Sequence, residues 1–260
     1  YDSDSILSIV YLPKSLTVLG GGVIASEYAS IFLALGVEVT MIDRYPKPLG
    51  FLDQDLTDRF VSQFERCGGR FIGNAEISEV CWNGLDAVVT TLDSGEQIES
   101  EKLLSAAGRV ANVKGLNIEA AGLTLNESGV IAVDADCRTA VSNIFAAGDI
   151  VGPYQFTHVA AHQGWYAAVN GLFGNLKKFK VDYRVIPWVT FIDPEVARVG
   201  INEQEAIDKG IDYEITRFEF EELDRAITDS AAKGFIKVIT PKGKDKILGV
   251  TVVSEHAGDL

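Results

Sequence analysis

The chain has 260 residues and 47% of them are hydrophobic, so it can bury a substantial core in one large domain or a few smaller ones. Its formal net charge is −14, which argues against nucleic acid or an anionic membrane surface as a partner, because both attract basic protein faces. No run of apolar residues approaches the length that crosses a bilayer.

The opening residues are predicted to be a lead-in to the first domain. Residues 2–5 offer helix N-caps, and residues 12–14 are typical of a loop before the first strand. The chain starts at Tyr1 rather than at a methionine, and it stops at Leu260, where a further helix is expected to begin. We therefore expect a piece of a longer protein, incomplete at both ends.

A dinucleotide-binding βαβ unit is predicted between Leu16 and Asp43. An apolar strand at 16–19 is followed by a glycine turn at 20–22, a helix from 23 to about 35, and a second apolar strand at 38–42. Because these parts and the final acid follow one another in register, the pattern favours a nucleotide site over an ordinary tight turn.

The glycine turn is the part of this unit that is expected to meet a pyrophosphate. Gly20 and Gly22 have no Cβ, so the backbone can turn sharply and approach the phosphates closely. The helix that starts at Val23 would point unpaired N–H groups and the positive end of its dipole at them. Ala25 takes the third glycine position of G-x-G-x-x-G, where a methyl group still permits close packing.

The acid that ends the second strand bears on which nucleotide is bound. The Asp43 carboxylate would accept hydrogen bonds from the adenosine ribose and would repel a 2′-phosphate, which favours NAD(H). Arg44 and Lys47 follow closely, and each is either in reach of a 2′-phosphate or part of an ordinary solvated surface. We therefore expect NAD(H), with NADP(H) as an alternative.

Two amphipathic helices are expected to pack on the strands of this domain. Residues at helical spacing predict the buried face of the first helix: Val23, Tyr28, Ile31, Phe32 and Leu35. The second helix should start near Asp53 and stop at residues 68–69. One face of that helix carries Leu56, Phe60, Phe64 and Cys67.

Further strands complete the first domain. A third strand is predicted at 70–72 and a final one at 102–106. Between them, residues 75–100 alternate in short runs that are broken at 83–84 and 93–95, both good hairpin turns. This middle segment is therefore predicted to be a β-meander.

The segment after this domain changes in character. Residues 143–149 are predicted to be an apolar strand that ends in Gly148 and Asp149, which would place a carboxylate at a strand's carboxyl end, where ligands of open α/β sheets bind. Gly-Asp is also a common turn pair, so a plain turn is the alternative. A helix at 159–173 and a solvated lysine-bearing loop are expected to follow.

The last part is predicted to be an α+β layer of antiparallel strands with one helix. It opens with a strand from Pro187 and a turn at 193–195, and a helix is expected at 202–209. Further strands are expected at 213–220, 234–240 and 247–253.

Five segments together resemble the FAD-dependent pyridine nucleotide–disulfide oxidoreductases, and the resemblance covers essentially the whole chain. The segments are residues 20–27, 107–109, 146–149, 156–164 and 193–200. The first half is most similar to the soluble pyridine nucleotide transhydrogenases. From about residue 154 the sequence is closer to mercuric reductase and dihydrolipoamide dehydrogenase-like members.

The resemblance implies an α/β fold of three parts. Residues 1–109 would form a Rossmann-like NAD(P)-binding domain with a β-meander and a lead-in. Residues 110–180 would be the carboxy-terminal portion of an FAD-binding domain, and residues 181–260 an incomplete α+β interface domain for homodimerisation.

The same resemblance implies roles for individual residues. Asp149 would hydrogen-bond the ribityl or pyrophosphate region of the flavin. Thr157, His158 and Ala160 would open a helix against the isoalloxazine, where backbone amides stabilise a reduced flavin. Glu27 would lie near the junction of nicotinamide and flavin, or serve as a first-turn acid favoured by the helix dipole. Gly108, in the motif at 107–109, is a further residue that would bind a cofactor in the nucleotide-binding part.

The three cysteines carry no expected catalytic role. Cys67, Cys81 and Cys137 are widely spaced, so neither a disulfide framework, a zinc site nor the Cys-x-x-x-x-Cys redox pair of the disulfide-using members is predicted. His256 does not match the family's acid–base histidine, and no metal site is expected. The cysteine pattern favours a reducing, cytoplasmic compartment.

The function expected from the resemblance is hydride transfer from NAD(P)H to FAD, with pyridine nucleotide transhydrogenation as the leading activity. Dihydrolipoamide dehydrogenase or mercuric reductase-type activity is the alternative among enzymes. A non-catalytic NAD-binding module is the alternative outside them, and the chain alone is expected to be inactive. The expected cofactors are NAD(H), or NADP(H), and FAD.

Overall fold

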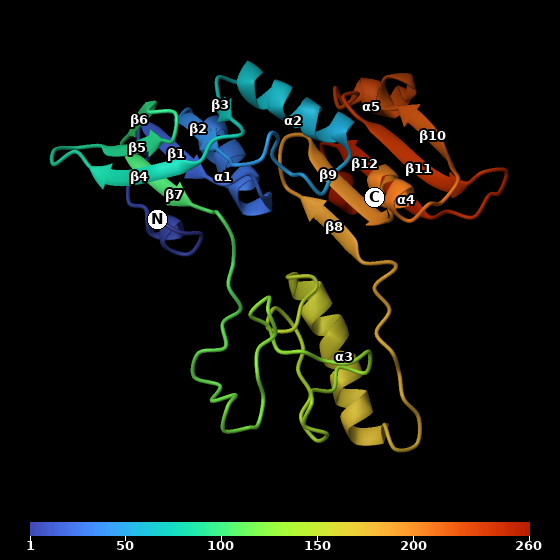
Figure 1. The fold of residues 1–260 in the computed structure, drawn as a ribbon. Helices are drawn as coiled ribbons and strands as arrows, with labels where there is room; N and C mark the ends of the chain where they lie inside the picture. Colours follow the sequence, from blue (N-terminus) through green and yellow to red (C-terminus); the bar gives the residue numbers. More distant parts are fainter. The chain divides into compact units, whose positions relative to one another are not determined.

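A computed structural model describes residues 1–260 and divides them into two compact units. Unit 1 comprises residues 1–108 and 187–260, and unit 2 comprises residues 109–186. In Figure 1, unit 1 runs from blue to green and from orange to red, whereas unit 2 is the yellow-green segment around helix α3. No helix is both long enough and apolar enough to span a bilayer.

A parallel sheet forms the first part of unit 1. Its strands lie in the order β3-β2-β1-β7, and all three pairings are parallel. The strands are β1 (Ser15–Leu19), β2 (Glu38–Ile42), β3 (Arg70–Ile72) and β7 (Lys102–Ser105). Leu16, Val18 and Met41 are buried. Parallel strands are covered on both faces, which is why their sequences are nearly continuous apolar runs. The predicted strands are confirmed.

Helix α1 (Val23–Ala34) follows β1, but its buried face differs from the predicted one. Ala25 and Ala29 are fully buried and Phe32 is nearly so, whereas Ile31 is 49% and Leu35 57% exposed. The prediction that Ile31 and Leu35 face the core is therefore wrong. Small side chains bring the helix backbone close to the sheet. The positions of the large apolar residues therefore did not reveal the face that contacts the sheet.

Helix α2 (Gln54–Arg66) buries Leu56, Phe60 and Phe64, as predicted, and the two phenyl rings lie 5.9 Å apart. Cys67, predicted for the same face, is exposed. It is the C-cap residue, and the chain turns away directly after it through Gly68 at φ +96°.

The β-meander forms a separate three-stranded sheet in the order β4-β5-β6. Its strands are β4 (Ile77–Trp82), β5 (Val88–Leu92) and β6 (Gln97–Ser100), all antiparallel to their neighbours. Gly84 and Gly95 adopt positive φ in the two connections, which confirms the predicted hairpin turns.

A five-stranded antiparallel sheet completes unit 1, in the order β10-β11-β12-β9-β8. Its strands are β8 (Pro187–Thr190), β9 (Glu195–Gly200), β10 (Tyr213–Glu219), β11 (Phe235–Pro241) and β12 (Gly249–Ser254). The predicted helix is α4 (Glu203–Asp208), and Asn202 caps it through a capping box with Glu205. A second short helix, α5 (Asp224–Thr228), was not predicted. Three 3₁₀ turns occur at η1 (Ser5–Ser8), η2 (Phe220–Glu222) and η3 (Ala257–Asp259).

Unit 2 contains one long helix, α3 (Thr157–Phe173), and extended loops around it. Its core gathers Leu123, Ile131, Ala146 and Val151. The strand predicted within residues 143–149 is wrong, because Phe145 forms only an isolated bridge with Arg138. Single bridges and side-chain hydrogen bonds hold these loops in place of a continuous ladder.

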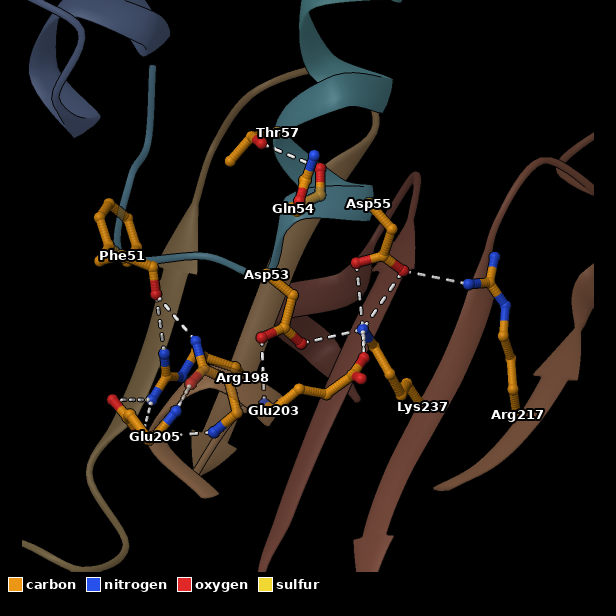
Figure 2. Close-up of polar contacts among 11 residues, drawn as sticks. Phe51, Asp53, Gln54, Asp55, Thr57, Arg198, Glu203, Glu205, Arg217 and Lys237 are labelled. Carbon is orange, nitrogen blue, oxygen red and sulfur yellow. Dashed lines mark hydrogen bonds and ion pairs between the residues drawn. The ribbon is translucent and has the colours of Figure 1, made fainter. Parts of the chain in front are cut away.

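A buried ammonium group joins the parallel-sheet part of unit 1 to its antiparallel sheet. Lys237 on β11 has a side chain only 2% exposed, and its Nζ lies 2.9 Å from Asp53, 3.1 Å from Asp55 and 2.6 Å from Glu203. Figure 2 shows the three carboxylates converging on Lys237 from the start of α2 and from α4, with Arg217 binding the far side of Asp55.

The protonation state of Lys237 follows from these contacts. Burial by itself lowers the pKa of Lys237, but hydrogen bonds to Glu203 and Asp53 outweigh it, so the pKa lies above its ordinary value. The group therefore stays an ammonium ion at neutral pH. Its contribution to stability is present below the unfolded-state pKa and is lost only as the pH rises through the folded-state pKa.

We expect Lys237→Met to lower the free energy of unfolding by about 2–4 kcal/mol at neutral pH, because it leaves buried Asp53 facing two further carboxylates without a counter-charge. Urea denaturation followed by tryptophan fluorescence measures this. Lys233→Met, the same change at an exposed position just before β11, is the control and should stay within about 0.5 kcal/mol of wild type. Equal stabilities of the two variants would contradict a structural role for the cluster.

Candidate functional site

A cleft of about 1480 Å³ in unit 1 opens at the carboxyl ends of the parallel strands. It is lined by the glycine turn at 20–22, the loop that follows β2, and residues 106–108 after β7. Glu203, Gln204 and Ile207 of α4 line it from the antiparallel sheet. The carboxyl edge of a parallel sheet is where ligands of such folds bind.

The glycine turn leaves the entrance to α1 open. Gly20 adopts φ +109°, and a Cβ there would come within 2.6 Å of the Ala106 carbonyl oxygen. Gly22 is the N-cap of α1, no side chain caps the helix, and a Cβ at Gly22 would meet no protein atom within 4 Å. The first N–H groups of α1, beginning at Val23, are thus available to an anion in the cleft. The residues fit a bound pyrophosphate.

Asp43 follows β2 and sits against the same turn. Its N–H donates to the Ile72 carbonyl at 2.9 Å, and a Cβ added at Gly21 would collide with its carboxylate. Gly21 was not among the predicted site residues, although its place in the glycine run was the available signal. The middle glycine gives the carboxylate the room it needs beside the glycine turn.

The basic residues beside Asp43 make local contacts. Arg44 is exposed, and its guanidinium lies 5.0 Å from the centre of the Tyr45 ring and 3.3 Å from the Tyr45 hydroxyl. Lys47 forms an ion pair with Asp58. Arg44 is therefore the basic side chain that remains in the cleft without a carboxylate partner in unit 1.

Glu27 lies on α1 and reaches the antiparallel sheet. Its Oε1 accepts a hydrogen bond from the Phe191 N–H at 2.9 Å. Burial raises the pKa of the Glu27 carboxyl, and the hydrogen bond from Phe191 partly offsets that shift. A half-buried carboxyl with a raised pKa is a common feature of functional clefts and of structural contacts alike.

The structure brings most of the predicted nucleotide residues to one place. Five of them line the cleft: Gly20, Gly22, Asp43, Arg44 and Gly108. Val23, Ala25 and Glu27 lie behind this lining on α1, and Ala25 is fully buried against the sheet. The βαβ pattern located the turn and the acid. It did not indicate the contribution of α4, which comes from a distant part of the sequence.

In unit 2 the predicted residues lie around the turn that precedes α3. Gly148 adopts φ +86°, and a Cβ there would lie 3.2 Å from the Cβ of Ala160. The Gly148 N–H donates to the Gln163 side chain at 2.6 Å. Asp149 is exposed and lies 3.6 Å from Arg109. The turn is thus held against the first turns of α3.

Gln163 is a functional candidate that the sequence did not single out. It is fully buried, and its amide nitrogen donates to the Gly152 carbonyl and to the Tyr183 hydroxyl, each at 2.8 Å. With the bond from Gly148, the side chain fixes the backbone on both sides of Asp149. Its place in the segment at 156–164, which resembles the family, was the available signal.

The amino end of α3 is likewise free of a capping side chain. The N-cap is Phe156, and Thr157 and His158 of the first turn are exposed. The Phe156 and His158 rings stack with their centres 5.3 Å apart. Helix α3 has 17 residues, and the first-turn positions Thr157 and His158 are exposed. Its amino end can therefore receive an anionic or polar group.

Comparisons with known proteins agree with both units. Residues 1–164 match the family model described as pyridine nucleotide-disulphide oxidoreductase, and residues 186–260 match its dimerisation domain. The chain is 36% identical over 258 residues to a dihydrolipoyl dehydrogenase of Chlamydia muridarum, covering 99% of this chain and 54% of the relative. It is 37% identical over 261 residues to a soluble pyridine nucleotide transhydrogenase of Colwellia psychrerythraea, covering 100% and 55%.

Solved structures show the same fold. LpdA from Mycobacterium tuberculosis superimposes with a TM-score of 0.92 at 27% identity, over 99% of this chain and 56% of that one. The HOCl-induced flavoprotein disulfide reductase RclA from Escherichia coli gives 0.90 at 29%, over 100% and 59%. The chain spans about half the length of the curated relatives it matches. It belongs to the pyridine nucleotide-disulphide oxidoreductase family.

Proposed function

We propose that the chain carries the nicotinamide-nucleotide site, and part of the flavin site, of an oxidoreductase in which NAD(P)H reduces FAD. Pyridine nucleotide transhydrogenation is the leading activity. The observation that carries the proposal is the open, uncapped start of α1 at Gly22, with Asp43 beside it in a cleft of about 1480 Å³.

The nucleotide would be bound mainly by backbone groups. Gly20, Gly22 and the N–H of Val23 would hold the pyrophosphate, and Ala25 would let the helix lie close enough to present those groups. Asp43 would accept hydrogen bonds from the adenosine ribose, which supports NAD(H) over NADP(H). Backbone binding also explains how an acidic chain of net charge −14 could hold an anionic ligand.

Two further cleft residues would complete this nucleotide site. Arg44 remains available to a 2′-phosphate, so NADP(H) is retained as the second nucleotide. Gly108 would let the backbone after β7 approach the ligand. Both line the same cleft as Asp43.

The flavin would be met by unit 2. Asp149 would hydrogen-bond its ribityl or pyrophosphate region. Thr157, His158 and Ala160 form the first turn of α3, and this turn would face the flavin ring. When bound, the flavin accepts the hydride, whereas the protein's part is to orient the two cofactors and to exclude water. The buried Gln163, which holds the Gly148 turn, supports a rigid placement of Asp149.

We further propose the domain organisation that goes with this activity. Residues 1–109 would bind NAD(P), residues 110–180 would belong to the FAD-binding domain, and residues 181–260 would form the homodimer interface. The match of residues 186–260 to a dimerisation domain supports the last assignment. Three unpaired cysteines support a reducing, cytoplasmic location.

Dihydrolipoamide dehydrogenase or mercuric reductase-type activity is the second candidate, supported by relatives named dihydrolipoyl dehydrogenase at nearly the same identity. A Cys-x-x-x-x-Cys pair in the flavin-binding part of the parent protein would favour it, and absence of the pair there would favour transhydrogenation. A non-catalytic NAD-binding module is the third candidate. Tightly bound flavin in the purified protein would exclude that candidate.

We expect Gly22→Val to weaken NADH binding by at least about tenfold, because a branched side chain would fill the space in front of the helix, where its Cβ meets no protein atom within 4 Å. Titration of NADH fluorescence measures the dissociation constant. Gly164→Val on α3, where a Cβ also meets nothing within 4 Å, is the matched control and should bind NADH as wild type does. Wild-type affinity in Gly22→Val would refute the nucleotide site.

We expect Glu27→Gln to change how stability depends on pH. The wild-type carboxyl has a folded-state pKa above its unfolded value of about 4.5, so wild type loses stability as the pH rises from that value through the folded pKa. Glutamine stays neutral and still offers an oxygen to the Phe191 N–H. The stability difference should therefore grow in favour of Glu27→Gln over this range and then level off.

Urea denaturation between about pH 4 and pH 8 measures this difference. Glu65→Gln, at an exposed position of α2, controls for the loss of one negative charge. Parallel pH profiles for wild type and Glu27→Gln would show that burial does not penalise the Glu27 carboxylate.

A further inference from the structure

We infer that Arg198 and Asn202 of the antiparallel-sheet part are positioning residues for the nucleotide, because they fix the loop at residues 44–52 that forms one wall of the cleft. The inference rests on the proposed nucleotide site. It adds residues that are remote in sequence from the βαβ unit and that do not themselves line the cleft.

The first part of the loop is tied to the phosphate-binding turn. The Leu49 N–H donates to the Gly21 carbonyl at 2.7 Å, and the Leu52 N–H donates to the Leu49 carbonyl at 2.8 Å. Leu49 is 1% exposed and adopts φ +55°, a left-handed conformation that costs free energy for a branched residue unless its surroundings hold it. The loop therefore has a defined attachment beside the pyrophosphate position.

The second part of the loop is tied to the antiparallel sheet. The Phe51 carbonyl accepts one hydrogen bond from Arg198 at 3.2 Å and one from the Asn202 side chain at 3.0 Å. The Phe51 ring lies 5.4 Å from the Trp188 ring on β8. Figure 2 shows Phe51 and Arg198 meeting at this junction. Both the backbone and the side chain of Phe51 are held.

Arg198 is itself immobilised. Its side chain is 4% exposed, its NH2 group lies 2.8 Å from Glu205, and its guanidinium stacks 4.7 Å from the centre of the Trp188 ring. One nitrogen therefore serves Glu205 while another serves the Phe51 carbonyl. A lysine could keep the ion pair, but its one nitrogen could not occupy the two separate positions from which the guanidinium reaches Glu205 and the Phe51 carbonyl.

The residues between these two attachments explain why the anchors matter. Arg44, Tyr45 and Gly50 are exposed and line the cleft. A loop whose ends are fixed loses less conformational freedom when a ligand binds, so anchoring raises affinity without a direct contact. Because this wall adjoins Asp43, the gain should fall on the adenosine part of the nucleotide.

Two variants separate anchoring from folding. Asn202→Ser supplies a hydroxyl that can still cap α4 but removes the side-chain amide that donates to the Phe51 carbonyl. Arg198→Lys keeps the positive charge beside Glu205. Each should weaken NADH binding about threefold, and the double variant about tenfold, because each single variant leaves one bond to the shared carbonyl. ADP-ribose, which lacks nicotinamide, should lose affinity by the same factors.

The dissociation constants are measured by fluorescence titration for NADH and by calorimetry for ADP-ribose. Hydrogen exchange should show faster exchange of the amides of residues 44–52 in the double variant, a change that general destabilisation would not confine to this loop. Arg225→Lys on α5, at an exposed arginine paired only with Asp229, is the control and should bind both ligands as wild type does.

Wild-type affinity in the double variant, with normal NADH binding by the wild-type protein, would overturn the inference alone. An equal loss in Arg225→Lys would overturn it as well. Failure of the wild-type protein to bind NADH would overturn the proposed function, and the inference with it.

Discussion

The structure depends on one backbone constraint, the way α1 begins. A helix leaves its first N–H groups without intrahelical partners, and most helices satisfy some of them with a capping side chain. Here the N-cap is Gly22, and no side chain takes that role. Unpaired donors, the positive end of the dipole and an open approach then coincide at the mouth of the cleft. That combination suits an anion, and it can act in an acidic protein because it needs no basic side chain.

A second constraint is the junction between the two sheets of unit 1. The loop after β2 enters α2 through residues 51–55. The antiparallel sheet and α4 bind the Phe51 carbonyl and the carboxylates of Asp53 and Asp55. Asp53 accepts from the Glu203 N–H and from Lys237, while Phe51 accepts from Arg198 and Asn202. One short segment thus links the cleft wall to the domain that matches a dimerisation family.

The local elements could be predicted from the sequence, because strand, glycine turn, helix and acid are encoded by residues close to one another. The βαβ unit, the β-meander turns and Asn202 as a helix boundary follow from such local rules. The buried face of α1 could not be predicted from large apolar side chains. Its contact with the sheet is made by Ala25 and Ala29, whose small side chains let the helix backbone lie close to the strands. Contacts between segments about 150 residues apart, such as Phe51 with Asn202, leave no periodic signal. Gln163 was missed because its partners, two backbone groups and the Tyr183 hydroxyl, are brought together only by the fold.

The most direct test of the central claim is hydrogen exchange of the backbone amides with and without NADH. We expect NADH to slow exchange at residues 21–25, where the helix donors face the cleft, and at residues 43–52, which form its wall. Strands β5 and β6 of the β-meander, at 88–100, do not line the cleft, so their exchange should be unchanged and serves as the internal reference. Unaltered exchange at residues 21–25 in the presence of saturating NADH would contradict the assignment of this helix start as the nucleotide site.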